Sequence, residues 1–211
     1  MSENQIIMSA LYCAQSLLGM GYSRKRRYRF YKDGSADCSS FVYACFLYAG
    51  LALKNGIKHN RVSCAQVYSQ DFDLLFPDNY DEIGKTFAIE GFFKEFGWRP
   101  GDIVFYCNDK STKRRNKITH VALCKDDRHI IHCGNNDEKT CIKDISYGDG
   151  NIVAVIRLKD GVLPNIGPKN FGRAGIMRKQ LIMNMHNEKI NCTGIPTLRF
   201  LVKCITKKKR L

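Results

Sequence analysis

The sequence lacks any hydrophobic run long enough to cross a membrane. Its 211 residues include no stretch near the roughly 18 consecutive apolar residues that a membrane helix needs. Residues 1–21 also lack the basic segment that opens a secretory signal peptide, and they carry the acidic Glu3. We therefore expect a protein that is made in the cytoplasm without a signal peptide and has no membrane partner.

The chain also lacks cysteine pairs of the C-x-x-C type, although it has ten cysteines. A chain of this length can bury an apolar core without disulfide bonds, so most of these cysteines are expected to be small buried side chains in a reducing compartment. Cys124, Cys133 and Cys141 lie near two histidines in the sequence, but the spacings match no zinc-binding pattern. We expect neither a metal nor another cofactor.

Positive charge is concentrated near the end of the chain. Of the net charge of +14, residues 159–211 carry +10, from 12 Lys/Arg against two acids, and residues 1–158 carry +4. Such a basic segment suits an anionic polymer: nucleic acid, anionic lipid, or a bacterial wall rich in phosphate and carboxylate. Because residues 159–172 are rich in glycine and proline, we expect one domain over 1–158 and a small basic helical appendage over 159–211.

The first quarter of the chain has apolar residues at helical spacing. This spacing over residues 3–19 predicts a helix that ends at the nearby glycines. A second helix is expected to begin near Cys38, to turn one wide apolar stripe toward a core, and to stop at Gly50. Cys45 belongs to that stripe and Cys13 to the first helix, so both are expected to be buried.

Apolar and alternating segments predict strands in the second half. They are residues 99–107, residues 117–134 as two strands joined by a turn at Lys125–Arg128, and residues 150–158. Helices that precede strands favour an α+β fold in which the helices pack on an antiparallel sheet.

Cys38 is the cysteine whose surroundings fit a nucleophile. A thiol attacks only as thiolate, so a nucleophilic cysteine needs a lowered pKa. A helix N-terminus lowers it by favouring an anion, and a nearby histidine lowers it by holding the proton. If the second helix begins at residues 37–39, Cys38 lies in its first turn, where the helix N-terminus can lower the pKa of the thiol.

His120 and His132 are the candidates for the histidine that lowers the pKa of Cys38. They are 12 residues apart, so both point to one face if each lies in a strand, and a hairpin that turns near Asp126 would place them directly opposite each other. His120 would take the thiol proton while His132 fixes its tautomer. His129 should face the other way. The spacing also fits two surface histidines in a hairpin, and this alternative stays open.

Five short motifs follow one another along the chain. They are "GY" at Gly21–Tyr22, "DCSSF" at Asp37–Phe41, "RVSCAQ" at Arg61–Gln66, "RPGDIVFY" at Arg99–Tyr106 and "HVALCKDDRHIIHCG" at His120–Gly134. In their order, and in the interval between the two histidines, the chain resembles the NlpC-type family of papain-like bacterial cell-wall peptidases. The resemblance covers roughly residues 5–157, and ordered motifs are more specific than any single one.

The resemblance implies a papain-like core and a cysteine endopeptidase that needs no metal. The family cleaves stem peptides of peptidoglycan, commonly at the γ-D-glutamyl bond to diaminopimelate or lysine. The implied roles are Cys38 as nucleophile, His120 as general base and then acid, His132 as the orienting third residue, and substrate binding by Tyr22, Asp37, Ser39 and Arg61. The backbone N–H of Cys38, helped by Tyr22, would stabilise the oxyanion. Ser40 stands where the family has glycine.

With no export signal and a basic appendage, the chain looks most like a phage or prophage endolysin. Its partner would be peptidoglycan, with anionic wall polymers held by residues 159–211, and it would act at the bacterial cell wall after release. Two alternatives stay within the enzymes: an N-acetylmuramoyl-L-alanine amidase of the same fold, and a secreted or injected antibacterial effector. The alternative from another class is a basic nucleic-acid-binding protein, but no nucleic-acid motif is present and nucleic acid is not the expected partner.

Overall fold

The structure of the protein is a computed structural model, which describes residues 5–25, 35–51, 80–85, 97–107, 118–147 and 152–158, together with Arg178, Gln180 and Ile182. The described helices are α1 (Gln5–Ser16) and α2 (Cys38–Tyr48). The described strands are β1 (Gly21–Tyr22), β2 (Ser35–Ala36), β3 (Tyr80–Lys85), β4 (Ile103–Tyr106), β5 (His120–Cys124), β6 (His129–Gly134), β7 (Lys139–Asp144) and β8 (Ile152–Leu158).

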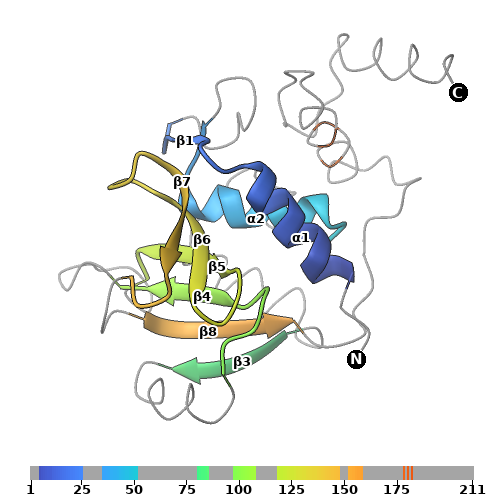
Figure 1. Ribbon diagram of the computed structural model, residues 1–211, viewed down its shortest axis with the longest axis vertical. Coiled ribbons are helices and arrows are strands. Elements are labelled where there is room, and N and C mark those ends of the chain that lie inside the picture. Colours follow the sequence, from blue (N-terminus) through green and yellow to red (C-terminus); the bar gives the residue numbers. More distant parts are fainter. Residues whose placement is uncertain are drawn as a thin grey trace, which may run out of the picture.

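The described strands form one eight-stranded sheet in the order β2-β1-β7-β6-β5-β4-β8-β3. β1 and β2 run parallel, and the other described neighbours run antiparallel. α1 and α2 pack against each other on one side of the sheet, where α2 contacts β5 and β6 (Figure 1). This arrangement confirms the predicted α+β class with an antiparallel sheet.

The predicted strand segments are confirmed, and further strands are present. Residues 99–107 contain β4, residues 117–134 contain β5 and β6, and residues 150–158 contain β8. The sequence does not predict β7, because the segment mixes Lys and Asp with its apolar residues. β7 forms because it pairs with β6 along its whole length. The sequence does not predict β1, β2 or β3 either.

The prediction that α2 has a single apolar stripe is wrong, because the helix is buried on all sides. Every residue from Cys38 to Leu47 is buried, including Tyr43 and Ala44, which lie outside the stripe. After two serines the helix has only apolar and aromatic residues, so it has no polar face to turn toward water. It ends as predicted before Gly50, whose φ of 91° favours glycine.

A buried ion pair joins the turn before β4 to β8. The carboxylate of Asp102 is 1% exposed and accepts hydrogen bonds from Nε and Nη2 of Arg157, each at 2.7 Å. It also accepts from the backbone N–H of Arg99 at 2.9 Å, while Nη2 of Arg157 donates to the carbonyl of Gly97 at 2.9 Å. The aspartate of the "RPGD" motif therefore has a structural role, since it holds the turn against β8.

Asp102→Ala is expected to lower the free energy of unfolding by about 3 to 5 kcal/mol, because the guanidinium of Arg157 is left without its partner in a largely buried site. Urea unfolding followed by circular dichroism measures the change. The control is Asp127→Ala, which removes an exposed carboxylate from the turn between β5 and β6 and should change stability little. A loss no larger than that of the control would contradict the structural role.

The predicted boundary between residues 158 and 159 follows the end of β8, but residues 159–177 lie outside the described residues. Arg178 belongs to the predicted appendage. Its Nε donates a hydrogen bond to the backbone carbonyl of Tyr48, at the end of α2, at 2.9 Å. Gln180 is fully buried. Apart from Ile182, the rest of the appendage lies outside the described residues, so its separation as a unit and its binding to the wall stay predictions.

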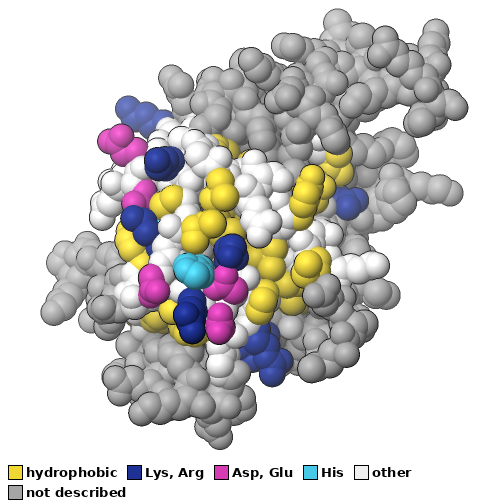
Figure 2. All heavy atoms as spheres, in the orientation of Figure 1, with side chains coloured by type: hydrophobic (Ala, Val, Ile, Leu, Met, Phe, Trp, Pro, Cys, Tyr) yellow, Lys and Arg dark blue, Asp and Glu magenta, His cyan; other side chains and the backbone are white. Residues whose placement is uncertain are grey.

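The described surface carries charges of both signs. On the face in Figure 2, Lys and Arg side chains are interspersed with those of Asp and Glu. This part of the described surface therefore has no patch of a single sign. In the portion of the chain that the structure describes, neither helix is long and apolar enough to span a membrane.

Candidate active site

Cys38 is the first residue of α2, as predicted. Asp37 caps the helix: its Oδ1 accepts hydrogen bonds from the backbone N–H of Ser40 at 2.8 Å and from the Ser39 hydroxyl at 3.0 Å. Ser40 completes a capping box, because its Oγ accepts from the backbone N–H of Asp37 at 2.9 Å. The cap fixes where the helix starts and places Cys38 at its positive N-terminal end.

The cap explains Ser40, which stands where the resembled family has glycine. A glycine has no hydroxyl to close the reciprocal half of the capping box. Asp37 and Ser39, expected at the substrate, are buried, and both take part in the cap. Their observed contacts hold Cys38 in place, and their role in substrate binding stays a prediction. Arg61 lies outside the described residues.

His120 and His132 lie on β5 and β6 as predicted, but they are not directly opposite each other. The two strands pair Cys124 with Ile130, and on this register His132 is opposite Ala122. His120 and His132 are therefore diagonal neighbours on one face of the hairpin. The prediction of direct pairing is wrong because the turn is centred one residue later than expected.

The two histidines nevertheless meet through their side chains. Nε2 of His120 lies 2.9 Å from Nδ1 of His132, and the rings meet edge to face with 5.0 Å between centroids. Burial, with a contribution from His132, lowers the pKa of His120 to about 3. Burial also lowers the pKa of His132 to about 4. Both imidazoles are therefore neutral at neutral pH, and each carries one ring proton.

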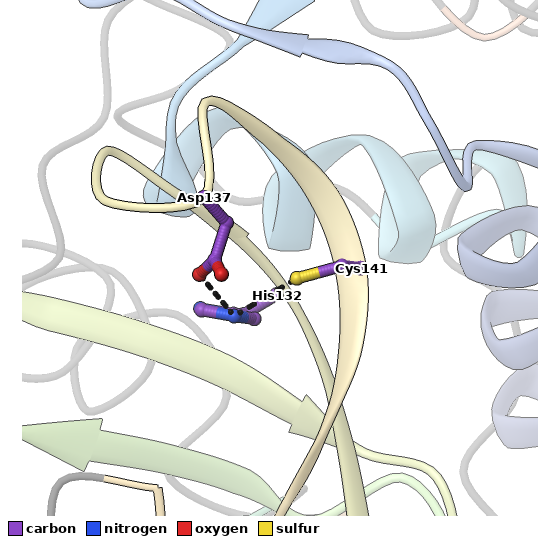
Figure 3. A group of neighbouring side chains, drawn as sticks. All are labelled: His132, Asp137 and Cys141. Atoms are coloured by element: carbon purple, nitrogen blue, oxygen red, sulfur yellow. Dashed lines mark hydrogen bonds and ion pairs between the residues drawn. The ribbon is translucent and has the colours of Figure 1, made fainter.

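Asp137, in the turn between β6 and β7, governs which nitrogen of His132 carries the proton. Its Oδ2 lies 3.3 Å from Nε2 of His132 (Figure 3). Burial favours the neutral acid, but the hydrogen bond from Lys143 and the neighbouring His132 outweigh it and hold the pKa of Asp137 below its usual value. The carboxylate favours a proton on Nε2 of His132, so Nδ1 is the acceptor. His120 then donates from Nε2, and its Nδ1 is the basic nitrogen.

Three more residues that the sequence does not predict contact the histidine pair. Sγ of Cys141 lies 3.4 Å from Nε2 of His132, its direct partner across β6 and β7. The ring of Tyr147 lies 4.7 Å from that of His132, and the ring of Tyr106 lies 5.8 Å from that of His120, between centroids. The two tyrosines shield the imidazoles from water, which fits their lowered pKa.

Gly134 leaves the space into which the His132 ring fits. A Cβ at this position would lie 2.7 Å from Cε1 of His132 and 3.0 Å from Oδ2 of Asp137. Real Cβ contacts are not this short, so any side chain here would displace the ring or the carboxylate.

Gly134→Ala is expected to slow the alkylation of Cys38 by iodoacetamide about tenfold or more, because a displaced His132 no longer orients His120. Peptide mass spectrometry of the alkylated protein measures the rate. The far-ultraviolet circular dichroism spectrum should stay unchanged, because the change affects one ring and not the strands. An unaltered rate of Cys38 alkylation would contradict the role of the His132 ring.

The start of α2 lies next to the strand positions that hold the histidines. Sγ of Cys133 donates to the carbonyl of Ala36 at 3.4 Å, and Cys38 shares a buried core with Cys133 and Val121. Tyr22 packs against the same core. Burial raises the pKa of Tyr22, and the charge of Cys38 raises it further, which places the Tyr22 hydroxyl in the electrostatic surroundings of that sulfur.

The histidine pair faces away from the helices. Val121 and Cys133 pack into the core beneath α2, so strand alternation turns the neighbouring His120 and His132 to the other face. Within the described residues, the contacts of His120 are with His132 and the rings of Tyr106 and Tyr147. A mechanism that uses His120 as the base for Cys38 therefore has to include a movement of His120 toward Cys38.

Other cysteines in the described residues are held as thiols. Burial raises the pKa of Cys45, Cys124, Cys133 and Cys141. Cys45 and Cys13 are fully buried, as predicted. Cys38 differs from the other four in lying at a helix N-terminus, where a thiolate is favoured.

No known sequence family and no curated protein matches the chain. It is similar to solved structures of NlpC/P60 proteins. NlpC1 from Trichomonas vaginalis has a TM-score of 0.47 at 18% identity, over 74% of this chain and 45% of that one. A protein described as similar to lipoprotein, NLP/P60 family, from Staphylococcus aureus has a TM-score of 0.49 at 19% identity, over 74% of this chain and 42% of that one.

The NlpC/p60 domain of the peptidoglycan hydrolase SagA has a TM-score of 0.36 at 16% identity, over 71% of this chain and 97% of that one. The chain spans less than half the length of the Trichomonas and Staphylococcus proteins. At these identities and TM-scores the likeness assigns no activity to the chain. The activity therefore has to rest on the chemistry of the site.

Proposed function

We propose that the protein is a cysteine peptidase that hydrolyses a peptide bond in the stem peptide of bacterial peptidoglycan. One observation carries the proposal: Cys38 opens a capped helix that packs on the two strands holding a buried, neutral and hydrogen-bonded histidine pair. In this site Cys38 is the nucleophile and His120 is the general base. His132 and Asp137 are positioning residues, because they act through His120.

The proposed mechanism begins with transfer of the thiol proton of Cys38 to Nδ1 of His120. The mechanism requires the ring of His120, the first residue of β5, to approach the start of α2. The thiolate attacks the carbonyl carbon, and the backbone N–H of Cys38, with the Tyr22 hydroxyl, stabilises the oxyanion. The imidazolium of His120 returns its proton to the leaving amine. Water activated by His120 then hydrolyses the thioester and frees the Cys38 thiol.

The choice of substrate rests on the resemblance of the sequence motifs to the NlpC-type peptidases. The SagA domain, to which the fold is similar, is that of a peptidoglycan hydrolase. The proposed bond is the γ-D-glutamyl bond to diaminopimelate or lysine, with Tyr22, Asp37, Ser39 and Arg61 at the substrate. The alternative cleavage site is the amide bond between muramic acid and L-alanine.

The proposed setting is cell lysis by a phage or prophage endolysin. The protein would be made in the cytoplasm and act at the bacterial wall after release, with residues 159–211 holding anionic wall polymers. An injected antibacterial effector would use the same chemistry. A wall-binding appendage favours the endolysin.

Digestion of purified peptidoglycan by the full chain, with mass spectrometry of the released muropeptides, tests the proposal. We expect fragments with a free γ-carboxyl on D-glutamate, and no release by Cys38→Ala. Fragments that end in free L-alanine at the amino terminus would identify the amidase instead. Release of muropeptides by Cys38→Ala would contradict the thiol mechanism. Cys45→Ala, which changes a buried thiol of the same helix, is the matched control and should keep the activity.

A further inference from the structure

His132, Asp137 and Cys141 form a group of three side chains of the types that bind metals, beside His120. They come from β6, from the turn that follows it and from β7, and their polar ends converge (Figure 3). The ligand atoms all lie within 4.8 Å of one another. An imidazole, a carboxylate and a thiolate together make a donor set that suits Zn²⁺.

The separations of these atoms fit a tetrahedral zinc ion. Nε2 of His132 lies 3.4 Å from Sγ of Cys141 and 3.3 Å from Oδ2 of Asp137. Zinc bonds of about 2.3 Å to sulfur and about 2.1 Å to nitrogen and oxygen, at tetrahedral angles, would place the first pair about 3.6 Å apart and the second about 3.4 Å apart. These two separations would therefore need to change by only about 0.2 Å or less to hold the ion.

Charge and hydrogen bonding also favour a cation at this place. Oδ2 of Asp137 is buried, and within the described residues its polar neighbour is Nε2 of His132 at 3.3 Å, too far for a strong hydrogen bond, while Oδ1 lies 2.6 Å from Nζ of Lys143. A thiolate at Cys141 would add negative charge beside the carboxylate of Asp137, whose other oxygen is already paired with Lys143. His132 and Cys141 are direct partners across β6 and β7, so the sheet fixes two of the three ligands.

We propose that this group is a zinc site and that bound Zn²⁺ switches off the Cys38 thiol. Coordination uses the lone pair of Nε2 of His132, so the ring proton of this neutral imidazole has to sit on Nδ1. Nδ1 of His132 then donates to Nε2 of His120, which lies 2.9 Å away. The proton of His120 consequently sits on Nδ1, the nitrogen that would otherwise accept the proton of Cys38.

The protons balance without a further reactant. His132 gives up its Nε2 proton and gains one on Nδ1, and His120 exchanges an Nε2 proton for one on Nδ1, so each ring keeps one proton. The thiol of Cys141 releases its proton to solvent when it becomes a ligand. Removal of zinc restores the earlier tautomers, so the switch is reversible.

Zinc binding by these three residues does not depend on whether the protein is a hydrolase. The switch does, because it rests on the proposed roles of Cys38 and His120. Binding is tested by titrating the full chain with Co²⁺ as a spectroscopic probe. We expect a thiolate-to-cobalt absorption band that Zn²⁺ displaces, that is lost in Cys141→Ala and that persists in Cys107→Ala. Cys107 is the matched control because its exposure is also intermediate. A band that survives Cys141→Ala places the metal elsewhere and overturns the site.

The switch is tested by alkylating the full chain with limiting iodoacetamide, with and without Zn²⁺. We expect Zn²⁺ to slow the alkylation of Cys38 about tenfold or more in the wild type and in Cys107→Ala, and to have no effect in Cys141→Ala. Slowing that persists in Cys141→Ala would mean that zinc binds Cys38 directly, which would overturn the switch. Peptidoglycan digestion by the wild type in the presence of a metal chelator, expected whether or not zinc binds, separates a failed zinc site from a failed hydrolase.

Discussion

His120→Ala is expected to lower kcat for the hydrolysis of a soluble muropeptide by about 10²- to 10⁴-fold, because the base that takes the proton of Cys38 is lost. KM should change little, since His120 is assigned to proton transfer and not to binding. The neighbouring Tyr106 and Tyr147 stay in place, so the fold should persist. Steady-state kinetics with circular dichroism of the same samples measure both effects.

His129→Ala is the matched control for His120→Ala. His129 lies on the same hairpin, but its Nδ1 pairs with Asp126 of the turn at 2.8 Å, away from the histidine pair. Its loss should leave kcat near the wild-type value. If the two variants behave alike, His120 is one of two ordinary hairpin histidines and the proposed mechanism is wrong.

Asp137→Asn is expected to lower kcat by up to about 10⁴-fold while KM stays near its wild-type value. The amide cannot supply the negative charge that favours a proton on Nε2 of His132. His132 then takes either tautomer, and His120 loses the fixed donor geometry that keeps its Nδ1 free to accept a proton. The split between kcat and KM distinguishes a positioning residue from one that merely supports the turn.

Glu138→Gln is the control for Asp137→Asn, because it removes the same charge one residue along the same turn, from an exposed side chain. It should leave both kinetic constants unchanged. Equal kcat values for Asp137→Asn and the wild type would contradict the tautomer argument. A fall of similar size in Glu138→Gln would point to the turn as a whole.

The helix start and the histidine pair could be predicted because both are local in sequence. "DCSS" contains the capping residue, the thiol and the reciprocal serine within four positions, and the helix does start at Cys38. The interval of 12 between His120 and His132 fixes a shared face once both lie in strands. It does not fix the register, because a shift of the turn by one residue changes which residues are opposite while it preserves the face.

Asp137 and Tyr147 could not be predicted, because their positions depend on β7. This strand carries Lys and Asp and shows little apolar alternation, and its position comes from pairing with β6. The turn that precedes it brings Asp137 back over His132, five residues earlier in the chain.

The central claim is that Cys38 is activated by a neutral His120. The most direct measurement is the alkylation rate of each cysteine at pH 6 with limiting iodoacetamide and a metal chelator. At that pH both imidazoles are neutral, because burial lowers the pKa of His120 to about 3 and that of His132 to about 4. In the wild type we expect Cys38 to be alkylated faster than the other nine cysteines. In His120→Ala we expect this difference in rate to disappear. Uniform labelling, or a lead of Cys38 that survives His120→Ala, would contradict the claim.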